Sequence, residues 1–146
     1  MLDQAHIKDM LNEIPLFAGC SPEALSSIAA IAVEKNAKRG EMIYDTGDQA
    51  LDMYVLVKGL VSFTTKSGVG HLHVETLMKR HMIFGWAALV PEHPRRLGNA
   101  KCLEDCILLS INGDTLLEVF DKHPQSGFIV MKRLCSMIAS TFIDKV

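Results

Sequence analysis

The centre of the chain is a series of short runs of β-forming residues separated by turns that contain glycine. Turns are indicated at Thr46-Gly47-Asp48, at Lys58-Gly59 and at residues 67–70. Short strands at such close intervals are typical of a closed or double-sheet β domain. The strands that we expect are residues 42–44, 53–57, 60–65, 71–78, 97–103 and 106–111.

Two helices are expected before this β region. Apolar residues recur at helical spacing over residues 9–17, and Pro15 restricts that helix to a short piece. A second helix begins at Ser21-Pro22, because serine is a good N-cap and proline suits the first helical position. Its apolar side continues through Val33, so we place its end at, or shortly before, residues 38–40.

The chain ends in helices again. Asn112 or Asp114 can cap a helix that runs to Phe120, and Pro124 begins a longer helix over about residues 125–143. Apolar residues of this last helix recur at alternating spacings of three and four, a heptad pattern that a partner helix could cover. We call these residues the seam: Phe128, Met131, Cys135, Ile138 and Phe142.

The order of helices, β region and helices predicts a fold that is mainly β with flanking helices. We expect one domain over residues 1–146. Within it, the N-terminal helices occupy residues 1–38, a β roll occupies residues 39–111, and the C-terminal helices occupy residues 112–146.

The composition is that of a globular domain and argues against several functional classes. Hydrophobic residues make up 49% of the chain and charged residues 22%, which excludes a disordered protein. A net charge of -2 gives no support for direct contact with nucleic acid, whose binders carry a basic field. No segment approaches the ~20 apolar residues of a membrane span, and no signal peptide is present, so we expect no membrane contact and a cytoplasmic location.

Candidate metal-binding and catalytic residues are few. His71 and His73 share one face of an expected strand, but no third ligand is local, so a solvent-facing pair is favoured over a metal or haem site. The four cysteines include no Cys-x-x-Cys pair, and we expect reduced, buried thiols. Neither a nucleophile–base pair nor a phosphate-binding P-loop is present, so we expect no enzyme and no catalytic residues.

Several segments resemble a known family. Residues 39–48, Arg-Gly-Glu-Met-Ile-Tyr-Asp-Thr-Gly-Asp, followed by residues 53–59, Met-Tyr-Val-Leu-Val-Lys-Gly, resemble the first half of a cyclic nucleotide-binding domain. This is the sensor module of the catabolite activator/FNR-like superfamily. The lead-in Ile-Pro-Leu-Phe at residues 14–17 is also typical, and the similarity covers roughly residues 10–140. The resemblance implies a double-stranded β-helix (jelly roll) with N-terminal helices and a long C-terminal helix.

The resemblance also implies a phosphate-binding cassette at residues 83–97, which we call the cassette. The family pattern is Phe-Gly-Glu, one residue, Ala-Leu, four residues, and Pro-Arg followed by small residues. By resemblance, Gly85 and its neighbours offer backbone N–H groups to the ligand and Arg95 pairs with its phosphate, an arrangement that suits an anion. The ligand-binding residues that we expect are Phe84, Gly85, Trp86, Ala87, Ala88, Leu89, Pro94, Arg95 and Arg96.

The cassette departs from the family pattern at two places. Trp86 stands where the family has a glutamate that accepts a hydrogen bond from the ribose, and Arg96 and Leu97 replace the small residues. The loss of one charged acceptor costs roughly 1.5–3 kcal/mol of binding free energy. Trp86 has three interpretations: a packed core aromatic, a wall on which a planar ligand stacks, or a plug that keeps the pocket empty. Glu92 could offer a substitute carboxylate.

These features predict a non-enzymatic, ligand-sensing regulatory domain. Its effector is expected to be a cyclic nucleotide, cyclic AMP or cyclic GMP, or a similar small anion, and binding would reposition the C-terminal helix. A homodimer through residues 125–143 is favoured, with an intramolecular role of the seam as the other interpretation.

Two settings fit such a domain. Family transcription factors carry a helix-turn-helix after the last helix, which this sequence lacks, so it is either the sensor part of a transcriptional regulator or a stand-alone module. The alternative function is a degenerate jelly-roll module that binds no ligand and acts in dimerisation or protein–protein interaction.

Overall fold

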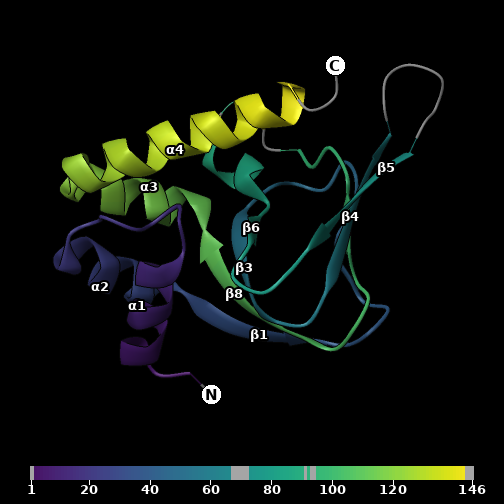
Figure 1. Ribbon diagram of the computed structural model, residues 1–146, viewed down its shortest axis with the longest axis horizontal. Helices are drawn as coiled ribbons and strands as arrows, with labels where there is room; N and C mark the ends of the chain where they lie inside the picture. Colours follow the sequence, from purple (N-terminus) through teal and green to yellow (C-terminus); the bar gives the residue numbers. More distant parts are fainter. Residues whose placement is uncertain (1, 67–72, 91, 93–94, 144–146) are drawn as a thin grey trace. The chain divides into compact units, whose positions relative to one another are not determined.

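The chain divides into two compact units (Figure 1). The computed structural model describes residues 2–66, 73–90, 92 and 95–143. One unit, the β unit, comprises residues 32–114, and the other, the helical unit, combines residues 1–31 with residues 115–146. The predicted order of helices, strands and helices is confirmed.

Two four-stranded antiparallel sheets make up the β unit. One sheet has the strand order β1-β8-β3-β6 and the other has the order β2-β7-β4-β5. Segments far apart in the sequence pair in both sheets, as Val33 does with Ser110 in the first and Met42 with Lys101 in the second. This arrangement confirms the predicted jelly roll. The strands are β1 Val33–Ala37, β2 Met42–Tyr44, β3 Asp52–Lys58, β4 Val61–Lys66, β5 His73–Met78, β6 Ile83–Phe84, β7 Asn99–Cys102 and β8 Cys106–Asn112.

Side chains from both sheets form one core between them. Alternate residues of a strand point to the same face, so each sheet contributes every second side chain to this core. Its centre is aromatic: the ring of Tyr54 stacks on that of Tyr44 at a centroid distance of 6.1 Å and on that of Phe84 at 5.3 Å. The buried members of the core are Ala37, Tyr44, Tyr54, Leu56, Val61, Phe84, Ala100, Cys102, Cys106 and Leu108.

In the described residues, four α-helices flank the strands along the sequence. Local caps explain where the first two begin: the carboxylate of Asp3 accepts a hydrogen bond from the His6 N–H at 2.9 Å, and the Ser21 hydroxyl accepts one from the Ala24 N–H at 3.1 Å. The helices are α1 Gln4–Glu13, α2 Pro22–Ile31, α3 Gly113–Lys122 and α4 Pro124–Ile143.

Two side chains of α4 bind the segment between α1 and α2. The Arg133 guanidinium donates to the carbonyl oxygens of Pro15 at 2.9 Å, Leu16 at 3.3 Å and Ala18. One helix of the C-terminal segment is therefore attached to the N-terminal segment by charge-assisted hydrogen bonds. The Ser126 hydroxyl, which is buried, accepts a further hydrogen bond from the Ser21 N–H at 3.0 Å.

The first helix differs from the prediction of residues 9–17 at both ends. It begins earlier because Asp3, through its bond to His6, supplies a cap that the apolar spacing does not reveal. It ends before Ile14, whose backbone is extended with φ -81° and ψ 125°. Pro15 causes this ending, because proline disfavours helical geometry at the preceding residue.

Residues expected at the end of the second helix form a strand instead. Helix α2 stops at Ile31, and Val33–Ala37 is β1, paired with β8. The sequence Val-Glu-Lys-Asn-Ala has little β character of its own, so pairing with the apolar strand β8 decides its conformation. The assignment of residues 1–38 to helices alone was therefore wrong.

The other strands match the prediction with shifted ends. Strand β7 covers Asn99–Cys102 in place of residues 97–103, since Leu97 is 75% exposed and precedes the pairing. The short strand β6, paired with β3, was not expected. The start of the expected strand 71–78 lies outside the described residues, and β5 begins at His73.

Replacement of Arg133 with alanine should destabilise the helical unit. The variant loses its hydrogen bonds to three carbonyl oxygens, and we expect the free energy of unfolding to fall by about 1–3 kcal/mol. Urea denaturation followed by circular dichroism measures this change. Arg80→Ala, at an exposed turn position, is the matched control and should leave the midpoint unchanged. Equal denaturation midpoints for the two variants would contradict a stabilising role of the hydrogen bonds from Arg133 to residues 15–18.

The stability of the β unit should fall at high pH because of Tyr44. Burial raises the pKa of Tyr44 from 10.0 to about 12, so the folded state holds this proton more tightly than the unfolded state. The resulting stability is fully present below pH 10 and is lost as the pH rises through 12. We expect a decrease of roughly 2–3 kcal/mol over this range. The stability of the wild type should fall relative to that of Tyr44→Phe as the pH rises above 10, because only the wild type carries the Tyr44 hydroxyl, and parallel pH profiles would refute the assignment.

Candidate functional site

The cassette begins where β6 pairs with β3. The register Tyr54↔Phe84 places the Phe84 side chain in the core, with only 2% of its surface exposed. Gly85 follows with φ 76°, a left-handed conformation that glycine adopts without strain. It precedes the short 3-10 helix η1, Trp86–Leu89, and its carbonyl accepts a hydrogen bond from the Ala88 N–H at 3.2 Å. Glycine therefore allows the abrupt change from strand to helix at the position that the sequence singled out.

The side chains of η1 differ in exposure. Ala88 and Leu89 are buried, at 7% and 2% exposure, and attach the turn to the β unit. Trp86 and Ala87 are half-buried. Solvent therefore reaches part of the indole of Trp86, and its emission should respond to whatever contacts it.

Gly113 brings the start of α3 directly against η1. A Cβ atom at Gly113 would lie 2.1 Å from the carbonyl oxygen of Ala88, so no side chain fits there. The Gly113 N–H donates to the Leu51 carbonyl at 2.9 Å and thereby fixes this position. The backbone of η1 and the first residue of α3 are consequently in direct contact.

Arg95 lies at the other end of the cassette with its side chain exposed. Its backbone forms an isolated bridge with Gln49, and its guanidinium donates one hydrogen bond to the Gly47 carbonyl at 3.3 Å. The turn of residues 45–48 is thus next to Arg95. An exposed guanidinium in this position can receive an anion from solvent.

Arg96 has the opposite orientation, because it is 4% exposed. Its Nη1 donates to the carbonyl of Gly85 at 3.0 Å and its Nη2 to the carbonyl of Asp52 at 2.5 Å. The carbon Cζ lies 4.1 Å from the centre of the Tyr44 ring, a cation–π geometry worth ~0.5–2 kcal/mol. The guanidinium therefore connects the cassette, the start of β3 and the aromatic core.

The charge of Arg96 has no acidic counterpart in the described part of the chain. No salt bridge joins its guanidinium to an Asp or Glu side chain among the described residues. The Nε atom of Arg96 is buried without a hydrogen-bond partner among the described residues. A buried charge without a carboxylate is costly and depends on its neutral hydrogen-bond acceptors and on the aromatic face.

The two adjacent arginines show what sequence reasoning could and could not locate. The sequence favoured Arg95 over Arg96 as the residue that pairs with the ligand phosphate. In the structure, the guanidinium buried in the β unit is that of Arg96. Consecutive residues of an extended segment point to opposite sides, so only one of the two can face inward. The bridge between Gln49 and Arg95 settles which one, and nothing local in the sequence signals that pairing. Pro94 lies outside the described residues, and Glu92 is exposed.

Among the described residues, the remaining candidates form no metal-binding group. His71 lies outside the described residues, and of His73 only the backbone in β5 is described. No group of three His, Cys, Asp or Glu side chains in the described ranges could hold a metal ion. The four cysteines are free: three are buried, Cys135 is exposed, and burial raises the pKa of Cys102 to about 12. Among the described helices, none is long and apolar enough to cross a bilayer.

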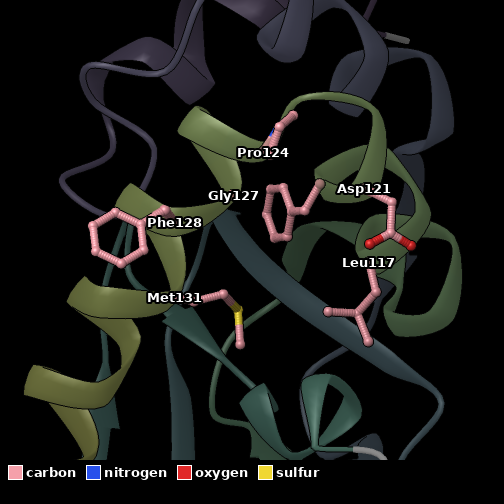
Figure 2. Close-up of a pocket in the computed structure, with 7 residues that line it drawn as sticks. Leu117, Asp121, Pro124, Gly127, Phe128 and Met131 are labelled. Carbon is pink, nitrogen blue, oxygen red and sulfur yellow. The ribbon is translucent and has the colours of Figure 1, made fainter.

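The helical unit carries an apolar hollow between α3 and α4. Its volume is about 540 Å³, and Figure 2 shows Leu117 of α3 and Met131 of α4 pointing toward it. The exposed residue Phe128, at 65% exposure, lies at the same surface. The residues that line the hollow are Leu117, Phe120, Asp121, Pro124, Gly127, Phe128 and Met131.

The seam of α4 stays largely open in the single chain. Val130 and Leu134, at 0% and 2% exposure, are apolar side chains that α4 buries in the helical unit. Phe128 and Cys135 of the seam are exposed, and Met131 and Ile138 are half-buried. Another face of the helix therefore supplies the intramolecular core. The side chain of Phe142 lies outside the described residues.

Comparison with known proteins identifies the family of the chain. The family model of the cyclic nucleotide-binding domain matches residues 34–123, which include the cassette. The potassium channel KOR2 of Oryza sativa subsp. japonica is 23% identical over 133 residues, 91% of this chain and 18% of the channel. The chain thus spans less than a fifth of the length of this curated relative.

Solved structures with the same fold include sensors and kinase regulatory domains. The sensor domain of the transcriptional regulator DNR from Pseudomonas aeruginosa superimposes with a TM-score of 0.79 at 17% identity, over 98% of this chain and 95% of that one. The regulatory domain of Toxoplasma gondii PKA, crystallised with cAMP, gives a TM-score of 0.77 at 19% identity, over 94% of this chain and 50% of that one. With the fold and the family model in agreement, the chain belongs to the cyclic nucleotide-binding domain family, whose members are regulatory ligand-binding domains.

Proposed function

We propose that the chain is a ligand-sensing regulatory domain that binds a cyclic nucleotide, or a similar small anionic effector, in the cassette. The observation that carries this proposal is the turn at Gly85, where a left-handed glycine joins β6 to η1 and the exposed Arg95 follows at the family spacing. Backbone N–H groups and a guanidinium together favour a ligand with a phosphate or carboxylate group. Cyclic AMP and cyclic GMP are the first effectors to test, since a kinase regulatory domain of this fold was crystallised with cAMP.

The contact between Ala88 and Gly113 supports a route for the signal. A ligand that shifts η1 also moves the backbone of Ala88, and no space separates that backbone from the first residue of α3. A displacement in the cassette would thereby change the position of α3, and through it that of α4. Such a change would bias the orientation of a downstream domain, as expected of the sensor part of a transcriptional regulator.

A homodimer through residues 125–143 belongs to the same proposal. The open seam of α4 supports it, because Phe128 and Cys135 are exposed while Val130 and Leu134 fill the core of the helical unit. Large apolar side chains at heptad spacing are stabilised when a second helix covers them. The hollow beside Phe128 extends this apolar surface.

A second candidate function is a non-binding jelly-roll module that acts through dimerisation or contact with other proteins. The observation that favours it is the buried Arg96, which sits beside Gly85, together with the absence of the family glutamate at Trp86. In this case the fold persists and the seam is its functional surface. Ligand titration discriminates between the two functions.

Titration with cyclic AMP and cyclic GMP should quench the emission of Trp86, the one tryptophan of the chain, and raise the melting temperature. Arg95→Ala should weaken binding by about ten- to hundredfold, because it removes a charge-assisted contact of roughly 1.5–3 kcal/mol. Arg39→Ala, at another exposed position, is the matched control and should bind like the wild type.

Two results would contradict the binding function. The first is an emission and a melting temperature that stay constant with both nucleotides, together with the absence of a small anion from mass spectra of the purified native protein. This result would reject ligand sensing in favour of the non-binding jelly-roll module. Unchanged affinity of Arg95→Ala would remove Arg95 from the site.

Phe128→Asp should convert a dimer into a monomer. The substitution places a charge within the seam, and a buried unpaired charge opposes association strongly. Light scattering coupled to size-exclusion chromatography measures the mass. Ser136→Asp, an equal change of charge at an exposed position outside the seam, should leave the dimer intact. A wild type that is monomeric at every concentration would exclude this mode of assembly.

A further inference from the structure

Arg96 fills the space beside the glycine of the cassette. A Cβ atom built on Gly85 would lie 3.1 Å from Arg96 Nη1 and 3.2 Å from Tyr54 Cδ2. Even one added carbon atom would therefore be crowded on this side of Gly85. A ligand group that approaches the Gly85 backbone from this side must displace the guanidinium.

The contacts that hold the guanidinium are of a kind that an anion can replace. Its acceptors are two neutral carbonyl oxygens, those of Gly85 and Asp52, and its Nε atom has no partner in the described part of the chain. It is 96% buried, yet the described residues place no carboxylate against it. An anionic oxygen is a stronger acceptor for guanidinium than a carbonyl, so an incoming anion offsets part of the cost of releasing the side chain.

The backbone of Arg96 is fixed independently of its side chain. Its N–H donates to the Asp48 carbonyl at 2.7 Å, and its carbonyl accepts from the Gly47 N–H at 2.9 Å. The guanidinium can consequently leave Gly85 by rotation about side-chain bonds alone, while the backbone hydrogen bonds of Arg96 to Gly47 and Asp48 stay in place.

We propose that the Arg96 guanidinium is a built-in competitor of the effector: it occupies the cassette in the free protein and must leave the Gly85 carbonyl when an anion binds. The inference rests on the proposed ligand-binding function of the cassette. It names Arg96 as the residue that determines how tightly an effector must bind in order to displace the guanidinium. Arg96 thereby raises the affinity that an anion must have for the cassette before it can occupy it.

Calorimetric titration with cyclic AMP of the wild type, Arg96→Ser and Arg95→Ser tests the competition. Arg96→Ser should bind cyclic AMP at least tenfold more tightly than the wild type, whereas Arg95→Ser, its immediate neighbour, should bind more weakly. Arg96→Lys keeps the charge but cannot reach both carbonyl groups, so it should bind more tightly than the wild type and serves if the serine variant fails to fold. Equal or weaker binding by the Arg96 variants overturns the inference.

The wild type itself provides a second readout. In nuclear magnetic resonance spectra of the ¹⁵N-labelled free protein, the Nε–H of Arg96 should be protected from exchange with water, and saturation with cyclic AMP should abolish this protection. Protection that persists in the complex refutes displacement even if the cassette binds the nucleotide. If neither the wild type nor any Arg96 variant binds cyclic AMP or cyclic GMP, the proposed function fails and this inference with it, which is a different result from binding that ignores Arg96.

Discussion

The buried guanidinium of Arg96 is the interaction on which the arrangement around the cassette depends. Its side chain joins the carbonyl groups of Gly85 and Asp52 and lies over the ring of Tyr44, while its backbone holds the turn at Gly47. Two sheets of a jelly roll pack through apolar and aromatic side chains, which have no directional preference strong enough to place a loop. In the free protein, the directional bonds of one cation supply that placement, at the cost of its desolvation.

The sequence predicted the regular parts of the fold well because their signals are local. Runs of β-forming residues and glycine turns indicated the strands, and Ser21 and Pro124 indicated where two helices begin. The strand at residues 33–37 was missed, since Glu-Lys-Asn is polar and only its pairing with β8 makes it extended. Tertiary pairing of this kind leaves no trace in the residues themselves.

The candidate site was predictable in its outline but not in its orientation. The glycine turn and the short helix at residues 85–89 lie where the family pattern places them. The roles of Arg95 and Arg96 depended on strand register, which a bridge between residues 49 and 95 determines. A shift of one residue in that bridge would exchange the inward and outward side chains, because successive residues alternate between the two sides of an extended segment. The half-buried state of Trp86 likewise arises from how η1 packs and not from its own sequence.

The attachment of α4 limits the ways in which this helix can move. Ser126 and Arg133 lie two turns apart on α4 and both bind the segment between α1 and α2, at Ser21 and at residues 15–18. A helix held at two points along one side cannot roll about its own axis without breaking both attachments. Any movement of α4 must therefore carry residues 15–21 along. The segment between α1 and α2 and the last helix consequently move together as one rigid group.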